Sequence, residues 1–171
     1  MTTGSSTVRT PAASSATCAS GSRAGRATAS SGARQRLVPF LGYEDAAAAI
    51  DWLCAVFGAT EDRGSRVTDA EGTIGHAELD IEGSTFFLST PAGYVGSRRH
   101  RESCEIERGM HDNPWVIDGL FVEVDDVSAH HARALEGGAA VIRGLAEPGI
   151  GYRIYTAEDL EGHRWMFGQR L

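Results

Sequence analysis

The sequence contains no lysine, so all 16 of its basic residues are arginines. It has no apolar run of 18 or more residues and no signal-peptide-like apolar segment near its start, so we expect neither a membrane span nor secretion. Its cysteines, Cys18, Cys54 and Cys104, are an odd, widely spaced set without a CxxC motif. We expect Cys54 to be a small buried side chain, and we predict reduced thiols in a cytoplasmic protein.

Charge is divided unevenly along the chain. Residues 1–36 contain five arginines and no acidic residue, whereas the remaining residues contain 11 arginines and 23 acidic residues. The globular part of the chain is therefore strongly acidic. An acidic surface repels phosphate backbones, so we expect no nucleic acid partner for this part.

Residues 1–36 consist mainly of Ser, Thr, Ala, Gly and Arg, with few large apolar side chains. Such a segment buries too little surface to offset the entropy lost on ordering, so we predict a disordered tail. The arginine-rich, acid-free composition also fits an organelle transit peptide, but the apolar stripe of an amphipathic helix is missing. A dispensable tail, or a start codon assigned too early, is the favoured interpretation.

The rest of the chain repeats one pattern at an offset of about 81 residues. In residues 37–90 a short strand precedes a helix with Asp45 as its N-cap, and three strands follow. The same order recurs in residues 119–171, where Asp126 is the expected N-cap. The pattern predicts an α+β fold of two tandem β-α-β-β-β modules.

The two predicted helices each have one apolar stripe that faces the core. His130 and His131 are adjacent on the second helix and diverge by ~100°, so they do not converge on one metal ion. We expect His131, rather than His130, to lie in the packed stripe. The stripes consist of Ala49, Ile50, Leu53, Cys54 and Phe57 in the first helix, and of Val127, His131, Ala134 and Leu135 in the second.

Residues 91–118 connect the modules and show no regular period. A connection of this length in a compact domain is usually a linker, a lid or a disordered segment. It contains the cluster Arg98–Arg101, which we expect to be solvated. It also contains Trp115, which is either a lid aromatic or an anchor at the junction of the modules.

The C-terminal stretch predicts two strands joined by a turn. In the last strand Trp165 and Phe167 share one face, and Arg164 and Met166 share the other. We expect the first face to pack on a helix and the second to form the floor of a cavity.

Three stretches stand out, GYEDAAAAIDWLCAVFGA in the first module and LFVEVDDVSAHHARALEGGA and YRIYTAEDLEGHRWMFG in the second. With the module pattern, they resemble the vicinal oxygen chelate superfamily, which contains glyoxalase I, bleomycin-resistance proteins and extradiol dioxygenases. The resemblance covers about residues 37–170. Its most specific motif is the turn Asp159–His163, in which Leu160 replaces the usual proline. The resemblance implies curved mixed sheets around a central cavity, helices outside, and a homodimer.

In metal-dependent members of this family, each module provides one cation ligand from its first strand and one from a late strand. The resemblance places these positions at Val38, Glu78, Gly119 and Met166. Only Glu78 carries a donor suited to the hard cations of this chemistry. The usual four-ligand metal site is therefore expected to be absent, and we predict no cofactor.

We predict that the ligand is held by side chains on the strand faces that point into the cavity. His76 and Glu78 are two residues apart on one strand, so they point the same way. They act with Arg153 as polar anchors, and an apolar lining suits a small-molecule pocket. The predicted ligand-binding residues are His76, Glu78, Trp115, Phe121, Arg153, Tyr155 and Met166.

Three functions remain open at this point. The first is a metal-independent binding protein that holds a small planar or aromatic molecule, for example to sequester a toxic natural product. The second is a lyase, isomerase or dioxygenase with a divergent metal site of Glu78 with His76 or His111, or with Glu78 as a general base. The third is a non-catalytic interaction module whose own side chains fill the cavity.

Overall fold

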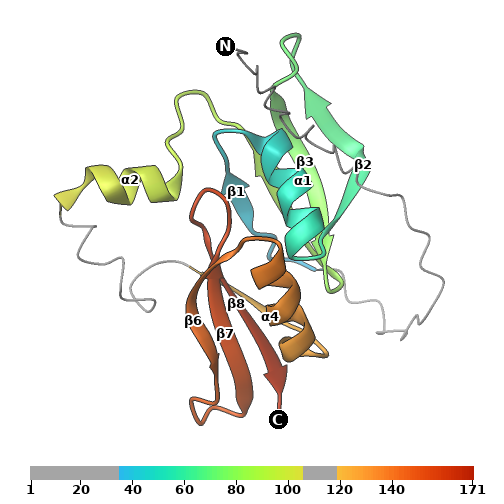
Figure 1. Cartoon of the computed structure of the whole chain (residues 1–171). Coiled ribbons are helices and arrows are strands. Elements are labelled where there is room, and N and C mark those ends of the chain that lie inside the picture. The colour runs from blue at the N-terminus through green and yellow to red at the C-terminus, as the bar shows by residue number, and fades with distance from the viewer. Residues whose placement is uncertain (1–34, 106–118) are drawn as a thin grey trace, which may run out of the picture.

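The computed structural model describes residues 35–105 and 119–171, which form two modules with the same order of elements (Figure 1). Each module begins with a short strand and a helix, and three further strands follow. The first module consists of β1 (Phe40–Gly42), α1 (Ala46–Val56), β2 (Thr60–Thr68), β3 (Ile74–Ile81) and β4 (Ser84–Ser89). The second consists of β5 (Gly119–Glu123), α4 (Val127–Glu136), β6 (Ala140–Ala146), β7 (Tyr152–Glu158) and β8 (Arg164–Arg170).

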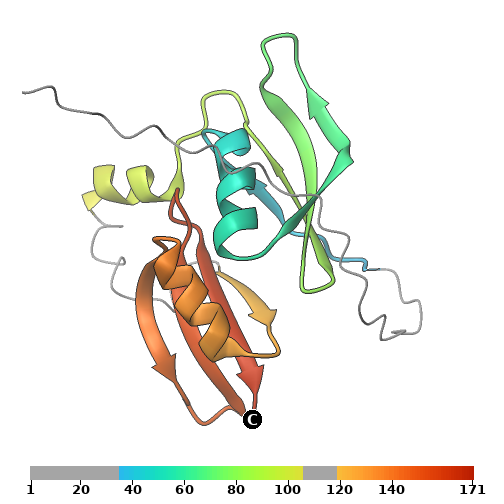
Figure 2. The ribbon, with the colours of Figure 1, turned by 45° about the vertical axis from the view of Figure 1, so that its right-hand side comes forward.

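Each module forms its own four-stranded mixed sheet, in the strand orders β1-β4-β3-β2 and β5-β8-β7-β6. The first strand of each module runs parallel to the last, and the other neighbours are antiparallel. Figure 2 shows α1 and α4 each covering one face of the sheet of its own module. The predicted α+β fold of two β-α-β-β-β modules is confirmed, but the two sheets stay separate and do not close around one central cavity.

Both helices begin and end where the sequence predicts. The Asp45 carboxylate accepts from one backbone N–H of the first turn at 2.9 Å, and Asp126 accepts from two at 2.9 and 3.0 Å. These bonds satisfy N–H groups that have no partner inside a helix. Gly58 and Gly138 follow the last turns with φ of 78° and 82°, a conformation that is strained for other residues.

An aromatic cluster joins the cores of the two modules. Trp165 and Phe167 of β8 are 1% and 0% exposed, so their predicted packing against the helix side is confirmed. The ring of Phe57, at the end of α1, lies 5.6 Å from Trp165 and 4.8 Å from Phe167 between ring centroids. Because Phe57 comes from the first module and β8 from the second, burial of these rings stabilises the contact between modules.

The packed stripe of α4 differs from the predicted one. His130 is 3% exposed, whereas His131 is half-buried and Leu135 is 51% exposed. The stripe runs through Val127, His130 and Ala134, at spacings of three and four residues. Histidine fits this buried place because both ring nitrogens have partners: Nδ1 contacts the Tyr155 hydroxyl at 2.6 Å and Nε2 contacts a backbone carbonyl oxygen at 3.2 Å.

The connection between the modules contains a helix that the sequence pattern did not reveal, α2 (Ser97–Ser103). Its arginines are not simply solvated as predicted. Arg101 is 4% exposed, and its guanidinium contacts Glu158 at 2.7 Å. Arg98 donates to the backbone carbonyl oxygens of Asp159 and Leu160 at 2.9 and 3.2 Å. These arginines anchor α2 on the second module.

Within residues 35–105 and 119–171, no helix has the length and apolarity needed to cross a bilayer.

The turn between β7 and β8 links the second module to the first. Asp159 is 1% exposed, and its Oδ1 accepts from three backbone N–H groups of its own turn. Its Oδ2 accepts from the hydroxyl of Tyr43 at 2.7 Å and from Nε1 of Trp165 at 3.1 Å. The Glu161 carboxylate of the same turn accepts from the backbone N–H groups of Glu44 and Asp45, at the start of α1.

We predict that Asp159→Asn destabilises the protein by about 2–4 kcal/mol. The amide nitrogen of Asn is a hydrogen-bond donor, and it would face N–H or O–H groups whose hydrogen bonds the carboxylate now accepts. Urea unfolding measures the loss. The matched control is Asp69→Asn, in the corresponding but exposed turn of the first module, where Asp69 Oδ1 also accepts from turn N–H groups. Equal losses in the two variants would contradict the proposed anchoring role of Asp159.

A second prediction concerns pH. Burial, and then the nearby charge of Arg133, lower the pKa of His130 to about 4. The unfolded state takes up this proton near pH 6.5 and the folded state does not. Stability is therefore complete above pH 6.5 and falls as the pH drops towards 4, by on the order of 3 kcal/mol.

Unfolding free energies measured from pH 7 to 4 test this prediction by comparing two variants. His130→Phe should flatten the pH dependence, because the group that titrates is gone. His131→Phe, at the next and half-exposed position, should keep the wild-type slope. An unchanged slope in His130→Phe would assign the titration to another group.

Candidate functional site

Each sheet has one face packed on its helix and one face that the helix leaves uncovered, which we call the open face. On the first open face, cross-strand pairing places Phe40, Phe87, Glu78 and Asp62 in one row across the four strands. The residues on either side of Phe87, Phe86 and Leu88, are buried against the helix side. Strand alternation therefore explains why Phe87 points the other way.

The second open face has the same arrangement. Phe121, Met166, Thr156 and Arg143 form the corresponding row across β5, β8, β7 and β6. Phe40 and Phe121 each lie five residues before the N-cap of their helix, so the two rows are equivalent. Phe87 corresponds to Met166 and Glu78 to Thr156.

The register of the strands corrects two of the predicted metal positions. Val38 precedes β1, and Gly119 pairs with Arg164 instead of Met166. Glu78 lies on β3, one strand away from the pair formed by the first and last strands of its module.

In each module the first and last strands pair two positions that carry no nitrogen or oxygen donor, Phe40 with Phe87 and Phe121 with Met166. These side chains do not fit a divalent cation, which requires oxygen or nitrogen ligands in this chemistry. Within residues 35–105 and 119–171, no group of three His, Cys, Asp or Glu side chains is placed to hold a metal ion.

An apolar groove of about 280 Å³ lies on the second open face. Its lining includes Met166 and Ile154 from the sheet, and Pro148 and Ile150 from the turn between β6 and β7. Phe121 closes one side. This volume is close to the lower end of the range for small-molecule pockets, about 300–1,000 Å³.

The ring of Phe121 lies over Gly168 of β8, and Phe121 is 44% exposed. A Cβ atom at Gly168 would come within 2.6 Å of the ring, so only glycine allows this approach. Tyr152 supports the ring in an edge contact with centroids 5.3 Å apart. Beside it, hydrogen bonds from Arg170 and Tyr152 lower the pKa of Glu123. The second open face thus presents an exposed aromatic surface with a charged edge.

The first open face is more polar. His76 Nε2 lies 3.3 Å from Glu78 Oε1, and the side chains are 32% and 37% exposed. The imidazole of His76 also contacts the ring of Phe87 edge-on, with centroids 4.8 Å apart. The predicted proximity of His76 and Glu78 is therefore present, and it leaves both side chains accessible to a ligand.

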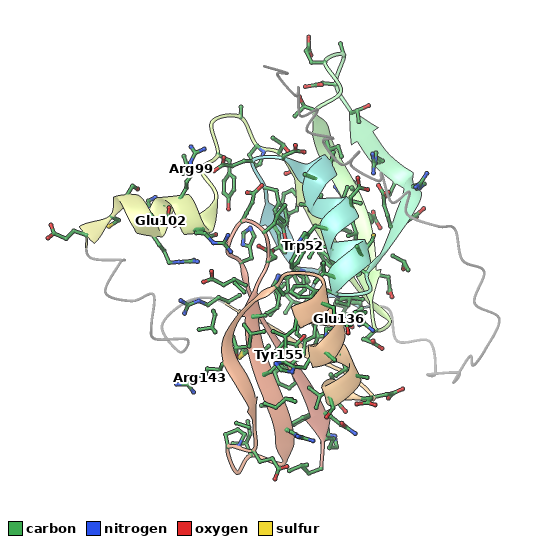
Figure 3. All side chains as sticks on the ribbon, viewed as in Figure 1. Trp52, Arg99, Glu102, Glu136, Arg143 and Tyr155 are labelled. Atoms are coloured by element: carbon green, nitrogen blue, oxygen red, sulfur yellow. The ribbon has the colours of Figure 1, made fainter. Side chains whose placement is uncertain are left out.

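Tyr155 and Arg153 lie on the opposite face of β7 from the one predicted. Tyr155, which is labelled in Figure 3, is among the residues around the groove. Its side chain is nevertheless 0% exposed, and its ring stacks on Phe167. Burial raises the pKa of its hydroxyl. Arg153 reaches Ser128 of α4 at 3.2 Å. Ile154 and Thr156, which alternate with them along β7, occupy the open face.

Four of the seven predicted ligand-binding residues lie on the open faces, as two groups. His76 and Glu78 lie together on the first open face, and Phe121 and Met166 lie together on the second. Trp115 is outside the described residues. The sequence analysis did not name Phe40, Phe87 and Ile154, which also lie on the open faces. For Phe87, its position between the apolar residues Phe86 and Leu88 could have indicated that it points away from the helix.

A family model described as Glyoxalase/Bleomycin resistance protein/Dioxygenase superfamily matches residues 36–167. An uncharacterised protein of Mycobacterium tuberculosis is 32% identical over 160 residues, which cover 88% of this chain and 86% of that protein. An uncharacterised protein of Mycobacterium bovis is 33% identical over 137 residues, which cover 78% of this chain and 82% of that protein.

Two solved structures have a similar fold. TioX from Micromonospora sp. ML1 has a TM-score of 0.57 and 31% identity, covering 80% of this chain and 97% of that one. TnmS3, an antibiotic-binding protein from Streptomyces sp. CB03234, has a TM-score of 0.51 and 18% identity, and the match covers 82% of this chain and 100% of TnmS3. At 18% identity, the second likeness concerns the fold alone.

Neighbouring positions on β7 provide a test of the two faces. Tyr155→Ala should lower the free energy of unfolding by about 3–5 kcal/mol, because it empties a buried site. Ile154→Ala should cost less than about 1.5 kcal/mol, because Ile154 is half-exposed on the open face. Denaturant unfolding of both variants measures the difference, and a larger loss in Ile154→Ala would reverse the assignment of the faces.

Proposed function

The chain belongs to the glyoxalase/bleomycin resistance protein/dioxygenase superfamily, and within it we propose that this protein binds a small planar organic molecule without a metal ion. One observation carries the proposal. In each module the first and last strands pair two positions, Phe40 with Phe87 and Phe121 with Met166, and all four carry ring or thioether side chains. Such side chains bind flat apolar surfaces and do not bind hard cations.

The second open face supplies the apolar part of the proposed site. The exposed ring of Phe121 offers a surface for a flat ligand, and Met166 and Ile154 continue the floor of the groove. Aromatic contacts of this kind add to the free energy gained by removing apolar surface from water. A partly exposed phenylalanine on a sheet face is more readily explained by ligand binding than by a contribution to folding.

The first open face supplies the polar anchors, His76 and Glu78. In a single chain these anchors and the groove lie on different sheets. We therefore propose a homodimer in which the first open face of one copy faces the second open face of the other. The charges support this pairing, because the row on the first face contains Glu78 and Asp62 and the row on the second contains Arg143.

The comparison with TnmS3 is consistent with this proposal at the level of the fold. That protein is an antibiotic-binding protein, and it shares this arrangement of modules. Sequestration of a toxic organic compound is accordingly the concrete form of the proposed function.

Catalysis is the second candidate, and the contact between His76 and Glu78 is the observation that favours it. Glu78 would act as a general base and His76 would orient or assist it. A divergent metal site that includes His111 would require a residue outside the described ranges. Loss of turnover in Glu78→Gln with unchanged ligand affinity would favour an enzyme over a binding protein.

A native mass spectrum of the protein as purified tests the proposed function directly. We expect a dimer mass, a bound organic molecule and no stoichiometric metal. A metal ion bound at one per chain, together with turnover of a substrate, would overturn the proposal.

Binding of a planar fluorescent probe provides a residue-level prediction. We expect 1-anilinonaphthalene-8-sulfonate to bind the folded protein and Phe121→Asp to weaken binding at least tenfold, because a charge replaces the exposed ring. The matched control is Leu135→Asp, which removes an apolar side chain of comparable exposure from α4. If both variants bind the probe as the wild type does, the open face is not the binding surface.

A further inference from the structure

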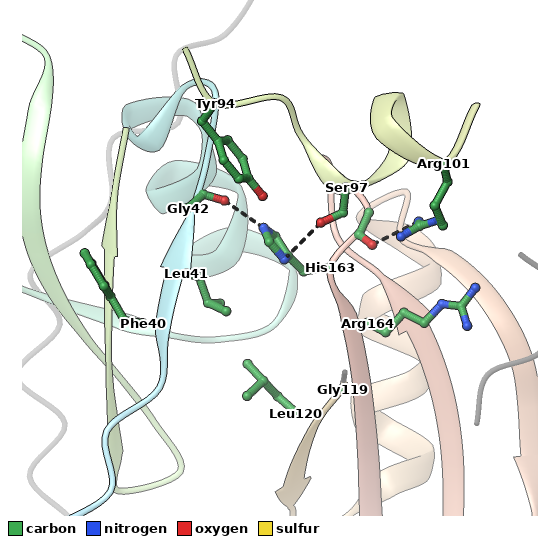
Figure 4. A pocket seen from close by; sticks show the side chains of 11 residues that line it. Phe40, Leu41, Gly42, Tyr94, Ser97, Arg101, Gly119, Leu120, His163 and Arg164 are labelled. Atoms are coloured by element: carbon green, nitrogen blue, oxygen red, sulfur yellow. Dashed lines mark hydrogen bonds between the residues drawn. The ribbon is translucent and has the colours of Figure 1, made fainter. Parts of the chain in front are cut away.

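A second cavity, of about 370 Å³, lies at the junction between the two modules, and we call it the seam pocket (Figure 4). Its walls come from β1, β5, the start of α2 and the turn before β8. None of the predicted ligand-binding residues that the structure describes lines it, and Phe40 is the one described residue that it shares with the rows on the open faces. Its volume falls within the usual range for small-molecule sites, about 300–1,000 Å³.

One end of the seam pocket is polar and contains His163. Nε2 of His163 lies 2.8 Å from the carbonyl oxygen of Gly42. A carbonyl oxygen only accepts hydrogen bonds, so Nε2 carries the proton and Nδ1 of the neutral ring is an acceptor. Nδ1 faces the hydroxyl of Ser97 at 3.5 Å, at the outer limit for a hydrogen bond (Figure 4). The pocket therefore offers an acceptor that is only weakly satisfied by the protein.

The charged side chains of the lining are already engaged in ion pairs. Arg101 contacts Glu158 at 2.7 Å and Arg164 contacts the same carboxylate at 3.5 Å. Both arginines are buried, and they share this one carboxylate. A ligand must keep a hydroxyl proton in order to donate it to Nδ1 of His163, so it binds there in its neutral form.

The rest of the lining suits a small ring. Leu41 and Leu120 form an apolar wall below His163 (Figure 4). Tyr94 lies against the backbone of Gly42, where a Cβ atom would come within 3.1 Å of its ring. An apolar wall, an aromatic ring and one hydrogen-bond acceptor together recognise a molecule with a flat carbon body and one hydroxyl donor.

We propose that the seam pocket is a binding site for a small neutral phenol, whose hydroxyl donates to Nδ1 of His163 and whose ring packs between Tyr94 and Leu120. The ligand would contact side chains from both modules. Its binding therefore stabilises their arrangement as well as the folded state. This site is separate from the groove on the second open face.

The test uses 4-methylphenol as the probe and the full-length protein. Isothermal titration calorimetry should show one molecule bound per chain. 4-Methylanisole has nearly the same shape but no hydroxyl donor, and it should bind at least tenfold more weakly because Nδ1 of His163 is left without its donor. Equal affinity for the two compounds would overturn the proposal, and so would a lack of binding of 4-methylphenol.

Two variants on α2 locate the site. Ser97→Phe should fill the polar end of the pocket and weaken binding of 4-methylphenol at least tenfold. Ser103→Phe, an exposed position on the same helix, should leave binding unchanged. Circular dichroism checks that both variants fold, and the comparison of the two compounds on the wild-type protein does not depend on either variant.

Phe121→Asp distinguishes this site from the proposed function. Binding of 4-methylphenol should survive this substitution, because Phe121 does not line the seam pocket. If Phe121→Asp abolishes binding of 4-methylphenol and Ser97→Phe does not, the phenol occupies the open face and the seam pocket is not its site. Failure of the fluorescent probe to bind the open face has no bearing on the seam pocket.

Discussion

The buried carboxylate of Asp159 is the interaction on which the rest of this structure depends. Its two oxygens accept five hydrogen bonds, three from the backbone of its own turn and one each from Tyr43 and Trp165. A buried charge is stable only when its hydrogen bonds are satisfied in this way. One side chain thereby shapes the turn, orients the largest ring of the core and connects the second module to the start of α1.

The corresponding turn of the first module shows what the surroundings add. Asp69 also accepts from backbone N–H groups of its own turn, but the turn is exposed and Asp69 reaches no side chain of the other module. The two turns have similar sequences and similar local hydrogen bonds. Only the turn of the second module is enclosed by α1 and α2. The carboxylate of Asp159 is therefore buried with all its hydrogen bonds made by the protein, whereas that of Asp69 stays in contact with water.

Each sheet is divided into a packed face and an open face, and the proposed ligand-binding surface lies on the open faces. Apolar side chains on the packed faces are needed for stability, whereas Phe40 and Phe121 remain 61% and 44% exposed on the open faces. Exposed aromatic side chains at equivalent positions of two modules are not required by the fold. Their presence on the paired first and last strands supports the proposed site for flat organic molecules.

The sequence by itself determined the module order, both N-caps, the alternation of the strands and the family, because these depend on local periodicity and on short motifs. It did not determine which face of β7 is open, since alternation separates two sets of side chains without telling which set meets the helix. That choice was made by the pairing of Tyr155 with Phe167. Register between distant strands likewise decided that Phe40 pairs with Phe87 and that Phe121 pairs with Met166. Burial of Arg101 beside Glu158 was decided only by the tertiary structure, because the partner lies 57 residues away and local sequence cannot supply a long-range contact.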